Sequence, residues 1–139
     1  MKKIYDLSLI ERNDVAENTI ELIFTKPGDY DFKIGQYTFL NVGEDPQNKN
    51  FVRPLSIASH PDEGILRFVM RTSDSEFKQR CLAMKKDDSA TVTKATGSFS
   101  FKFSDKEIIF LISGIGIAPI IPMLMELEKI DYQGKVSLF

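Results

Sequence analysis

Phe51-Val52-Arg53-Pro54-Leu55-Ser56-Ile57-Ala58-Ser59 is an apolar stretch that carries an arginine and a serine within one short predicted strand. Because proline has no N–H to donate, Pro54 places this strand at the edge of a sheet, at a bulge or at a strand end. Arg53 and Ser56 then become accessible to a ligand. A guanidinium suits a phosphate, and a hydroxyl can donate and accept a hydrogen bond. The alternative is that Arg53 makes a surface ion pair and that Ser56 satisfies the hydrogen bonding of a strand end.

Further short strands are predicted on both sides of this stretch. Apolar and polar residues alternate over residues 4–10, 19–25, 36–42, 65–71, 90–94 and 98–103. Turn residues separate them, at Asn13-Asp14, at Pro27-Gly28-Asp29 and in the turn that begins with His60. Many short strands with close turns predict an antiparallel barrel or sandwich. Phe99, Phe101 and Phe103 alternate with polar residues, which predicts an aromatic face that packs in the core.

One helix is predicted to interrupt the strands, over residues 75–86. Its apolar residues recur near helical spacing, and Ser73, Asp74 or Ser75 can cap its start. The free N–H groups and partial positive charge at a helix start attract anions, and a pyrophosphate would suit them. The alternative is an amphipathic helix that closes one end of the barrel, and both roles can hold together.

The pattern changes near Ser104. The continuous apolar run over residues 108–112 is typical of a strand buried on both faces, and a helix over residues 119–129 and a strand over residues 136–139 follow. A strand–helix–strand unit of this kind begins a doubly wound nucleotide-binding fold. We therefore divide the chain into domains 1–104 and 105–139. The glycines of Gly114-Ile115-Gly116 allow a phosphate to approach the backbone, or form a plain tight turn.

Composition excludes several classes of protein. In 139 residues, 42% hydrophobic and 27% charged residues with a net charge of −2 indicate an ordinary globular protein without the basic surface of a nucleic-acid-binding protein. Cys81 is the single cysteine, which excludes an intrachain disulfide framework and fits a cytoplasmic location. We expect no signal peptide, no membrane span and no metal site. His60 is expected to be a solvated loop residue, and Cys81 an apolar residue on a helix face.

Four stretches together resemble the ferredoxin–NADP(H) reductase family. Arg53-Pro54-Leu55-Ser56 resembles its Arg-x-Tyr-Ser motif, and Gly35-Gln36-Tyr37 the Gly-Gln-Tyr before that motif. The segment that holds the flavin pyrophosphate in the family is resembled by Arg71-Thr72-Ser73-Asp74-Ser75-Glu76-Phe77-Lys78. The family's nicotinamide-dinucleotide loop is resembled by Gly114-Ile115-Gly116-Ile117-Ala118-Pro119. The resemblance implies a mainly β fold, with a six-stranded antiparallel flavin-binding barrel and one capping helix. An incomplete α/β (β-α-β) nucleotide-binding domain is implied to follow.

The resemblance also implies a function. A flavin-dependent NAD(P)H oxidoreductase passes a hydride from NAD(P)H to FAD, or to FMN, and electrons then leave for a ferredoxin, a flavodoxin or another acceptor. Arg53 would pair with the pyrophosphate, and Ser56, the candidate catalytic residue, would hydrogen-bond the isoalloxazine near N5. The other implied cofactor-binding residues are Pro54, Leu55, Phe68, Val69, Met70, Ser73, Asp74 and Ser75 for the flavin, and Gly114, Ile115, Gly116 and Pro119 for the dinucleotide.

Some features depart from the family pattern. Leu55 stands where an aromatic residue stacks on the flavin, and Ile115 where threonine or glycine is common. The sequence stops inside the nucleotide-binding domain, so we expect a truncated, inactive chain with apolar strands exposed at residues 108–112 and 136–139, and a homodimer through them. One alternative is a non-catalytic electron-transfer subunit completed by a partner chain, as in dihydroorotate dehydrogenase. Another is a barrel retained for protein contacts.

Overall fold

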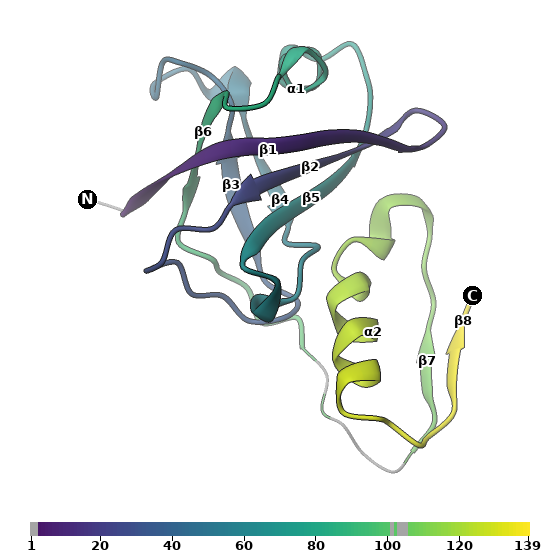
Figure 1. Cartoon of the computed structure of the whole chain (residues 1–139). Helices are drawn as coiled ribbons and strands as arrows, with labels where there is room; N and C mark the ends of the chain where they lie inside the picture. The colour runs from purple at the N-terminus through teal and green to yellow at the C-terminus, as the bar shows by residue number, and fades with distance from the viewer. Residues whose placement is uncertain (1–2, 101, 103–105) are drawn as a thin grey trace.

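The computed structural model describes residues 3–100, 102 and 106–139. A larger part, made of a β-sheet and one helix, is followed by a smaller part (Figure 1). The sheet contains β1 (Ile4–Ala16), β2 (Thr19–Thr25), β3 (Tyr37–Asn41), β4 (Val52–Ser56), β5 (Ile65–Arg71) and β6 (Ser89–Thr93). Helix α1 (Glu76–Ala83) lies over one end of it, and β7 (Ile108–Phe110), α2 (Ile120–Lys129) and β8 (Val136–Leu138) make up the smaller part. Short 3₁₀ turns lie at η1 (Lys49–Phe51), η2 (Pro61–Glu63) and η3 (Gly114–Ile117).

The sheet is antiparallel and open. Its strand order is β4-β3-β6-β1-β2-β5, so β4 and β5 are the two edges. A main-chain bond of 2.8 Å from Ala58 N to Arg67 O joins the segment after β4 to β5, but among the described residues no ladder pairs the two strands. The predicted fold class is confirmed, with the difference that the six strands do not close into a complete barrel.

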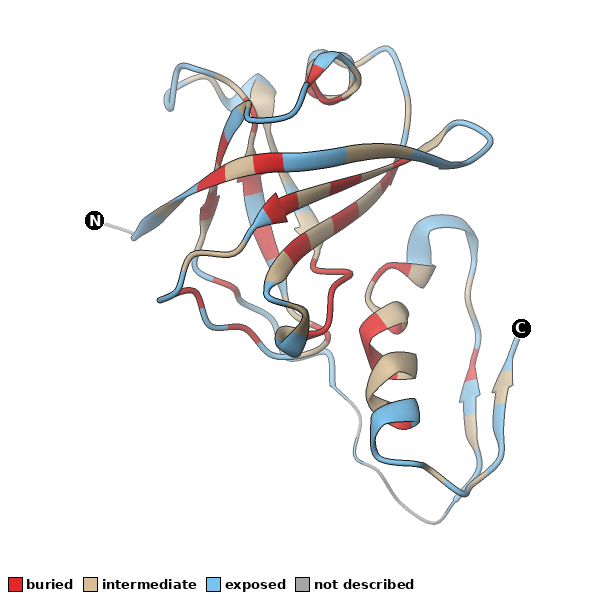
Figure 2. Cartoon of the chain, in the orientation of Figure 1, coloured by how far each residue is buried: buried red, intermediate tan, exposed pale blue. Residues whose placement is uncertain are grey.

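Alternation along the strands builds the main core. In β2 and β5 every second residue is buried, as the alternating colours of Figure 2 show. Leu22, Phe24 and Phe68 are fully buried, and the two phenylalanine rings meet edge to face with centroids 6.1 Å apart. Burial of each such side chain stabilises the fold by about 1.5–3 kcal/mol. Phe77 and Cys81 extend this core from the buried face of α1, which confirms the expected apolar role of Cys81.

Two local predictions are wrong. Asn13 and Asp14 do not turn the chain; they pair with Glu21 and Ile20 inside a longer β1. The chain turns after Ala16, where Asn18 adopts φ 49, a left-handed conformation that asparagine tolerates in tight hairpins. The second error concerns residues 98–100, which form no strand. Phe101 and Phe103 lie outside the described residues, and so does the predicted domain boundary between residues 104 and 105.

The smaller part is the predicted β-α-β unit. Strands β7 and β8 pair in parallel, and α2 connects them in sequence. Helix α2 buries Ile120, Met123 and Leu127 against Phe110 of β7, in a second apolar cluster. Ile34, from the loop before β3, packs against the same cluster and so joins the two parts. No helix in the described ranges is long and apolar enough to cross a bilayer.

A glycine allows close packing at this junction. Gly35 adopts φ +91, and a Cβ built on it would lie 1.7 Å from the Phe99 carbonyl oxygen and 3.2 Å from the Met123 Cε. A side chain at position 35 would therefore push α2 or the residue 99 backbone away from the sheet.

Candidate functional site

The outer edge of β4 carries Pro54 and Ser56. Val42 N donates to Phe51 O and Ile57 N to Gln36 O, so the odd-numbered residues of this segment bond β3. Because hydrogen bonding alternates along an antiparallel pair, the main chains of Pro54 and Ser56 face the open edge. Of the three positions predicted for Pro54, a sheet edge, a bulge or a strand end, the structure shows the sheet edge, where the missing N–H leaves no ladder bond unmade.

The edge of β5 is open in the same way. Thr72 N donates to Asn18 O on the β2 side, whereas Arg67 O accepts from Ala58 N on the other side. The N–H and C=O of Val69, two residues after Arg67, therefore also face the open edge. Beside it, the side chains of Phe68 and Met70 are buried in the core, so these two residues can contribute packing but not exposed side chains.

Arg53 lies between η1 and the start of α1. Its Nη1 donates to Val52 O at 2.7 Å, Asn50 O at 3.3 Å and Lys49 O at 3.4 Å. Its guanidinium carbon lies 5.6 Å from the centroid of the Phe77 ring. These contacts fix the side chain near the first turn of α1, and within the described part of the chain its Nε and Nη2 have no acceptor.

The start of α1 is capped and lies beside two cations, Arg53 and Lys78. Ser75 Oγ accepts from Lys78 N at 3.4 Å, which confirms the predicted cap, and the Ser73 carbonyl accepts from Gln79 Nε2 at 2.8 Å. Burial, with a contribution from the Arg53 charge, lowers the pKa of Lys78. The cations Arg53 and Lys78, next to free helix N–H groups, favour an anion with several oxygen acceptors, although the first turn also carries the acid Glu76.

A hydrogen bond fastens the turn that carries Arg53 to this helix. Asn50 Nδ2 donates to the Glu76 carboxylate at 2.7 Å. Asp74 lies in the same turn as Ser73 and Ser75 with an exposed side chain, where its main chain but not its carboxylate suits an anion. The structure thus brings together Arg53, Lys78 and the Ser73–Ser75 turn.

Leu55 and Ser56 follow on the same strand. Leu55 is half-buried and packs against the main core from the inner face of β4. Ser56 pairs with Tyr37 of β3 and is half-buried on the outer face. A flat ring placed along this edge would meet aliphatic cover from Leu55 and a hydroxyl from Ser56.

The Gly114 loop forms a separate group, next to the end of β5. Gly114 adopts φ +55, and a Cβ there would lie 3.6 Å from Arg71 Nη2. Gly116 N donates to Ser113 O at 3.1 Å, so this amide is used within the turn. Pro119 occupies the N-cap position of α2 without a capping hydrogen bond from its side chain. Ile115 is exposed beside a cleft of about 720 Å³ that is also lined by Arg71 and Gly114.

Arg71 was not predicted as a site residue, although it lies in the segment that resembles the pyrophosphate-binding stretch. In the structure it lies at the end of an edge strand with an exposed side chain and without an ion pair among the described residues. The sequence signal that could have identified it is an arginine at the end of the predicted strand over residues 65–71. A free guanidinium beside a glycine turn is suited to a phosphate.

The expectation for His60 is wrong. The residue is 6% exposed, and its Nε2 lies 2.5 Å from Glu126 Oε2 on α2. Its neighbour in sequence, Pro61, begins η2, and the His60 side chain caps that turn by accepting from Asp62 N. The contact to α2 joins residues far apart in sequence, so no local pattern indicated it.

Solved structures share this fold. A ferredoxin NADP+ reductase from Neisseria gonorrhoeae, with bound FAD and NADP, is 22% identical with a TM-score of 0.84, over 99% of this chain and 57% of that one. A cytochrome P450 reductase from Amycolatopsis is 19% identical with a TM-score of 0.80, over 99% of this chain and 43% of that one. A ferredoxin-NADP+ reductase from Plasmodium falciparum is 18% identical with a TM-score of 0.79, over 97% of this chain and 57% of that one.

These comparisons confirm the reductase fold that the sequence motifs indicated. The chain spans about half the length of the solved proteins that it matches. No protein-family model and no curated protein sequence matches it.

Proposed function

We propose that this chain binds FAD, with FMN as the alternative, as part of a flavin-dependent NAD(P)H oxidoreductase. The observation that carries the proposal is the convergence of Arg53, Lys78 and the capped start of α1 beside the open edge of β4. The shared fold with a reductase that was solved with FAD and NADP supports it.

Each group of residues has a distinct proposed role. Arg53, Lys78 and the main-chain N–H groups of the Ser73–Ser75 turn bind the diphosphate. Leu55 covers the isoalloxazine ring, and the Ser56 hydroxyl forms a hydrogen bond to the ring near N5. The main chains of Pro54 and Val69, which face the open edges of β4 and β5, align the cofactor. Phe68 and Met70 support this edge from the core. The bound flavin supplies the redox chemistry, and the protein binds and orients it.

The second substrate in this proposal is NAD(P)H. Gly114, Ile115, Gly116 and Pro119 would contact it, with Arg71 as an added phosphate partner. Electrons would leave for a redox protein or a small-molecule acceptor, in the cytoplasm. The chain spans 57% of the length of the Neisseria reductase. Turnover with NAD(P)H is therefore proposed for a whole protein that contains this chain.

A second candidate is an electron-transfer subunit that a partner chain completes, and a homodimer is a related form of it. The observation that favours it is the exposed apolar surface around the short strands β7 and β8. It is formed by Ile109, Leu111, Val136, Leu138 and Phe139. If a partner chain completes the subunit, purification from the native source would yield a second polypeptide in stoichiometric amount. If the chain forms a homodimer, the purified protein would have twice the mass of one chain.

Calorimetric titration with FAD, FMN, ADP and riboflavin tests the main proposal. We expect Arg53→Ala to weaken FAD and ADP binding by at least about tenfold, because a hydrogen bond to a charged group contributes about 1.5–3 kcal/mol. Riboflavin has no phosphate, so its affinity should stay within about twofold. Arg12→Ala, at an arginine of β1 that pairs with Asp14, is the matched control. Absence of flavin binding, or equal FAD affinity in Arg53→Ala, would refute the proposal.

A further inference from the structure

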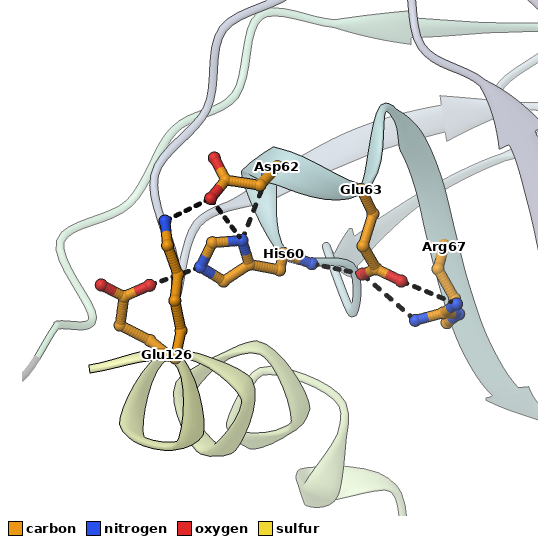
Figure 3. Close-up of polar contacts among 6 residues, drawn as sticks. His60, Asp62, Glu63, Arg67 and Glu126 are labelled. Atoms are coloured by element: carbon orange, nitrogen blue, oxygen red, sulfur yellow. Dashed lines mark hydrogen bonds and ion pairs between the residues drawn. The ribbon is translucent and has the colours of Figure 1, made fainter. Parts of the chain in front are cut away.

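A polar network joins the sheet to α2 at the start of β5 (Figure 3). His60 contacts Glu126 through Nε2 at 2.5 Å, and its own main-chain N–H donates to the Glu63 carboxylate at 2.6 Å. Arg67 of β5 pairs with that carboxylate at 3.0 Å and with Glu21 of β2 at 2.8 Å. His60 is therefore linked to the sheet through its main-chain N–H and to α2 through its side chain.

The hydrogen bonds define the tautomer of His60. Asp62 N donates to Nδ1 at 3.1 Å, so Nδ1 is the acceptor nitrogen of the ring. Nε2 then carries the proton and donates to the Glu126 carboxylate. His60 is buried and Glu126 is half-buried, so this charge-assisted bond is shielded from water. The nearby ion pair of Lys129 with Asp62 joins the same two elements at the exposed surface.

Helix α2 and the η3 turn that leads into it contact the sheet at opposite ends of β5. Glu126, near the end of α2, meets His60 just before η2 and β5. At the other end, η3 leads into α2 and places Gly114 beside Arg71, the last residue of β5. The bond from Ala118 N to Ile115 O couples η3 to the start of the helix. A shift of α2 by one residue along its axis would move η3 by about 1.5 Å relative to Arg71.

We propose that the His60–Glu126 bond is a latch that sets the axial position of α2 and thereby the distance from the Gly114 loop to Arg71. His60 and Glu126 are then positioning residues for the dinucleotide, a role that rests on the function proposed above. The apolar contact of α2 with Ile34 holds the helix on the sheet but is non-directional, whereas the latch specifies one position along it.

Amide hydrogen exchange on the full chain tests the latch without a ligand. The amides of Gly116 and Ala118, both bonded within η3, report on the loop. We expect His60→Leu and Glu126→Leu to speed their exchange by at least about tenfold, while the Ile20 and Leu22 amides of β2 stay within about twofold. His60→Gln keeps an N–H donor and Glu126→Gln keeps an acceptor, so each should restore part of the protection. Lys129→Met, which removes the exposed ion pair between the same elements, is the matched control.

Titrations with FAD and NADPH separate this inference from the proposed function. The latch variants should bind FAD within about twofold of the unmodified chain and NADPH at least about tenfold more weakly. If the unmodified chain binds no flavin, the proposed function fails, and the exchange experiment alone decides on the latch. Unchanged exchange at Gly116 and Ala118 in Glu126→Leu would overturn the latch, even if His60→Leu unfolds. Equal effects of Glu126→Leu and Lys129→Met would also overturn it.

Discussion

At the scale of single residues, Cys81 links burial to a pH dependence. Burial raises the pKa of its thiol from 9.0 to about 12. Between these values the unfolded chain has released the proton and the folded chain still binds it, so the free energy of unfolding falls as pH rises. The stabilisation is fully present below about pH 9 and is lost progressively toward pH 12.

The difference between the natural chain and Cys81→Ala isolates this effect. We expect Cys81→Ala to lower the free energy of unfolding at neutral pH, because the smaller side chain leaves a cavity. In alkaline solution the free energy of unfolding of Cys81→Ala should fall less steeply with pH than that of the natural chain. Urea unfolding of both proteins from about pH 7 to about pH 10.5 gives the two slopes. Parallel slopes would mean that the thiol ionises as readily in the folded chain as in the unfolded one.

Leu55 decides how strongly the edge of β4 can stack on a ring. Leu55→Tyr should tighten FAD binding by about 2- to 10-fold, since an aromatic pair contributes about 0.5–1.5 kcal/mol beyond area burial. It should also quench the flavin fluorescence further. Leu55→Met, of similar volume and aliphatic, serves as the control and should leave FAD affinity and fluorescence unchanged. A tyrosine that changed neither quantity would place the ring away from Leu55.

At the scale of elements, Ser75 tests the start of α1. Ser75→Ala removes the acceptor for Lys78 N, and we expect a loss of about 1 kcal/mol in the free energy of unfolding. Ser98→Ala, at an exposed serine outside any strand or helix, should be neutral within about 0.5 kcal/mol. Equal unfolding free energies for Ser75→Ala and the natural chain would show that the cap adds nothing.

Elements defined by local pattern were predictable from sequence. The alternation of β2, the single proline of β4 and the capping serine of α1 are each determined by neighbouring residues, and each prediction is confirmed. Features that depend on distant segments were not. The turn expected at Asn13-Asp14 is overridden because β2 pairs with a longer β1, and His60 is buried and contacts a carboxylate on α2. Arg71 became a candidate site residue because the Gly114 loop, which follows much later in the sequence, lies beside it in space.

At the scale of the whole molecule, the two parts differ in how completely their apolar residues are covered. The sheet encloses a core in which the largest side chains are fully buried, whereas β7 and β8 are short strands with α2 against one face. Ile109 and Leu111 alternate with the buried Phe110, so their side chains project from the face away from α2. Leu111 is 81% exposed, and such a surface on open strand edges promotes association.

We therefore predict that the chain associates through this face. Sedimentation velocity over a range of concentrations should show a rising mean mass for the natural chain, and Ile109→Lys with Leu111→Lys should hold it monomeric. Because both side chains already contact water, the double variant should keep the unfolding free energy within about 1 kcal/mol. Ile4→Lys, at an exposed isoleucine of β1, controls for the added charge and should associate like the natural chain. A natural chain that stays monomeric at all concentrations would show that the β7–β8 surface does not drive self-association.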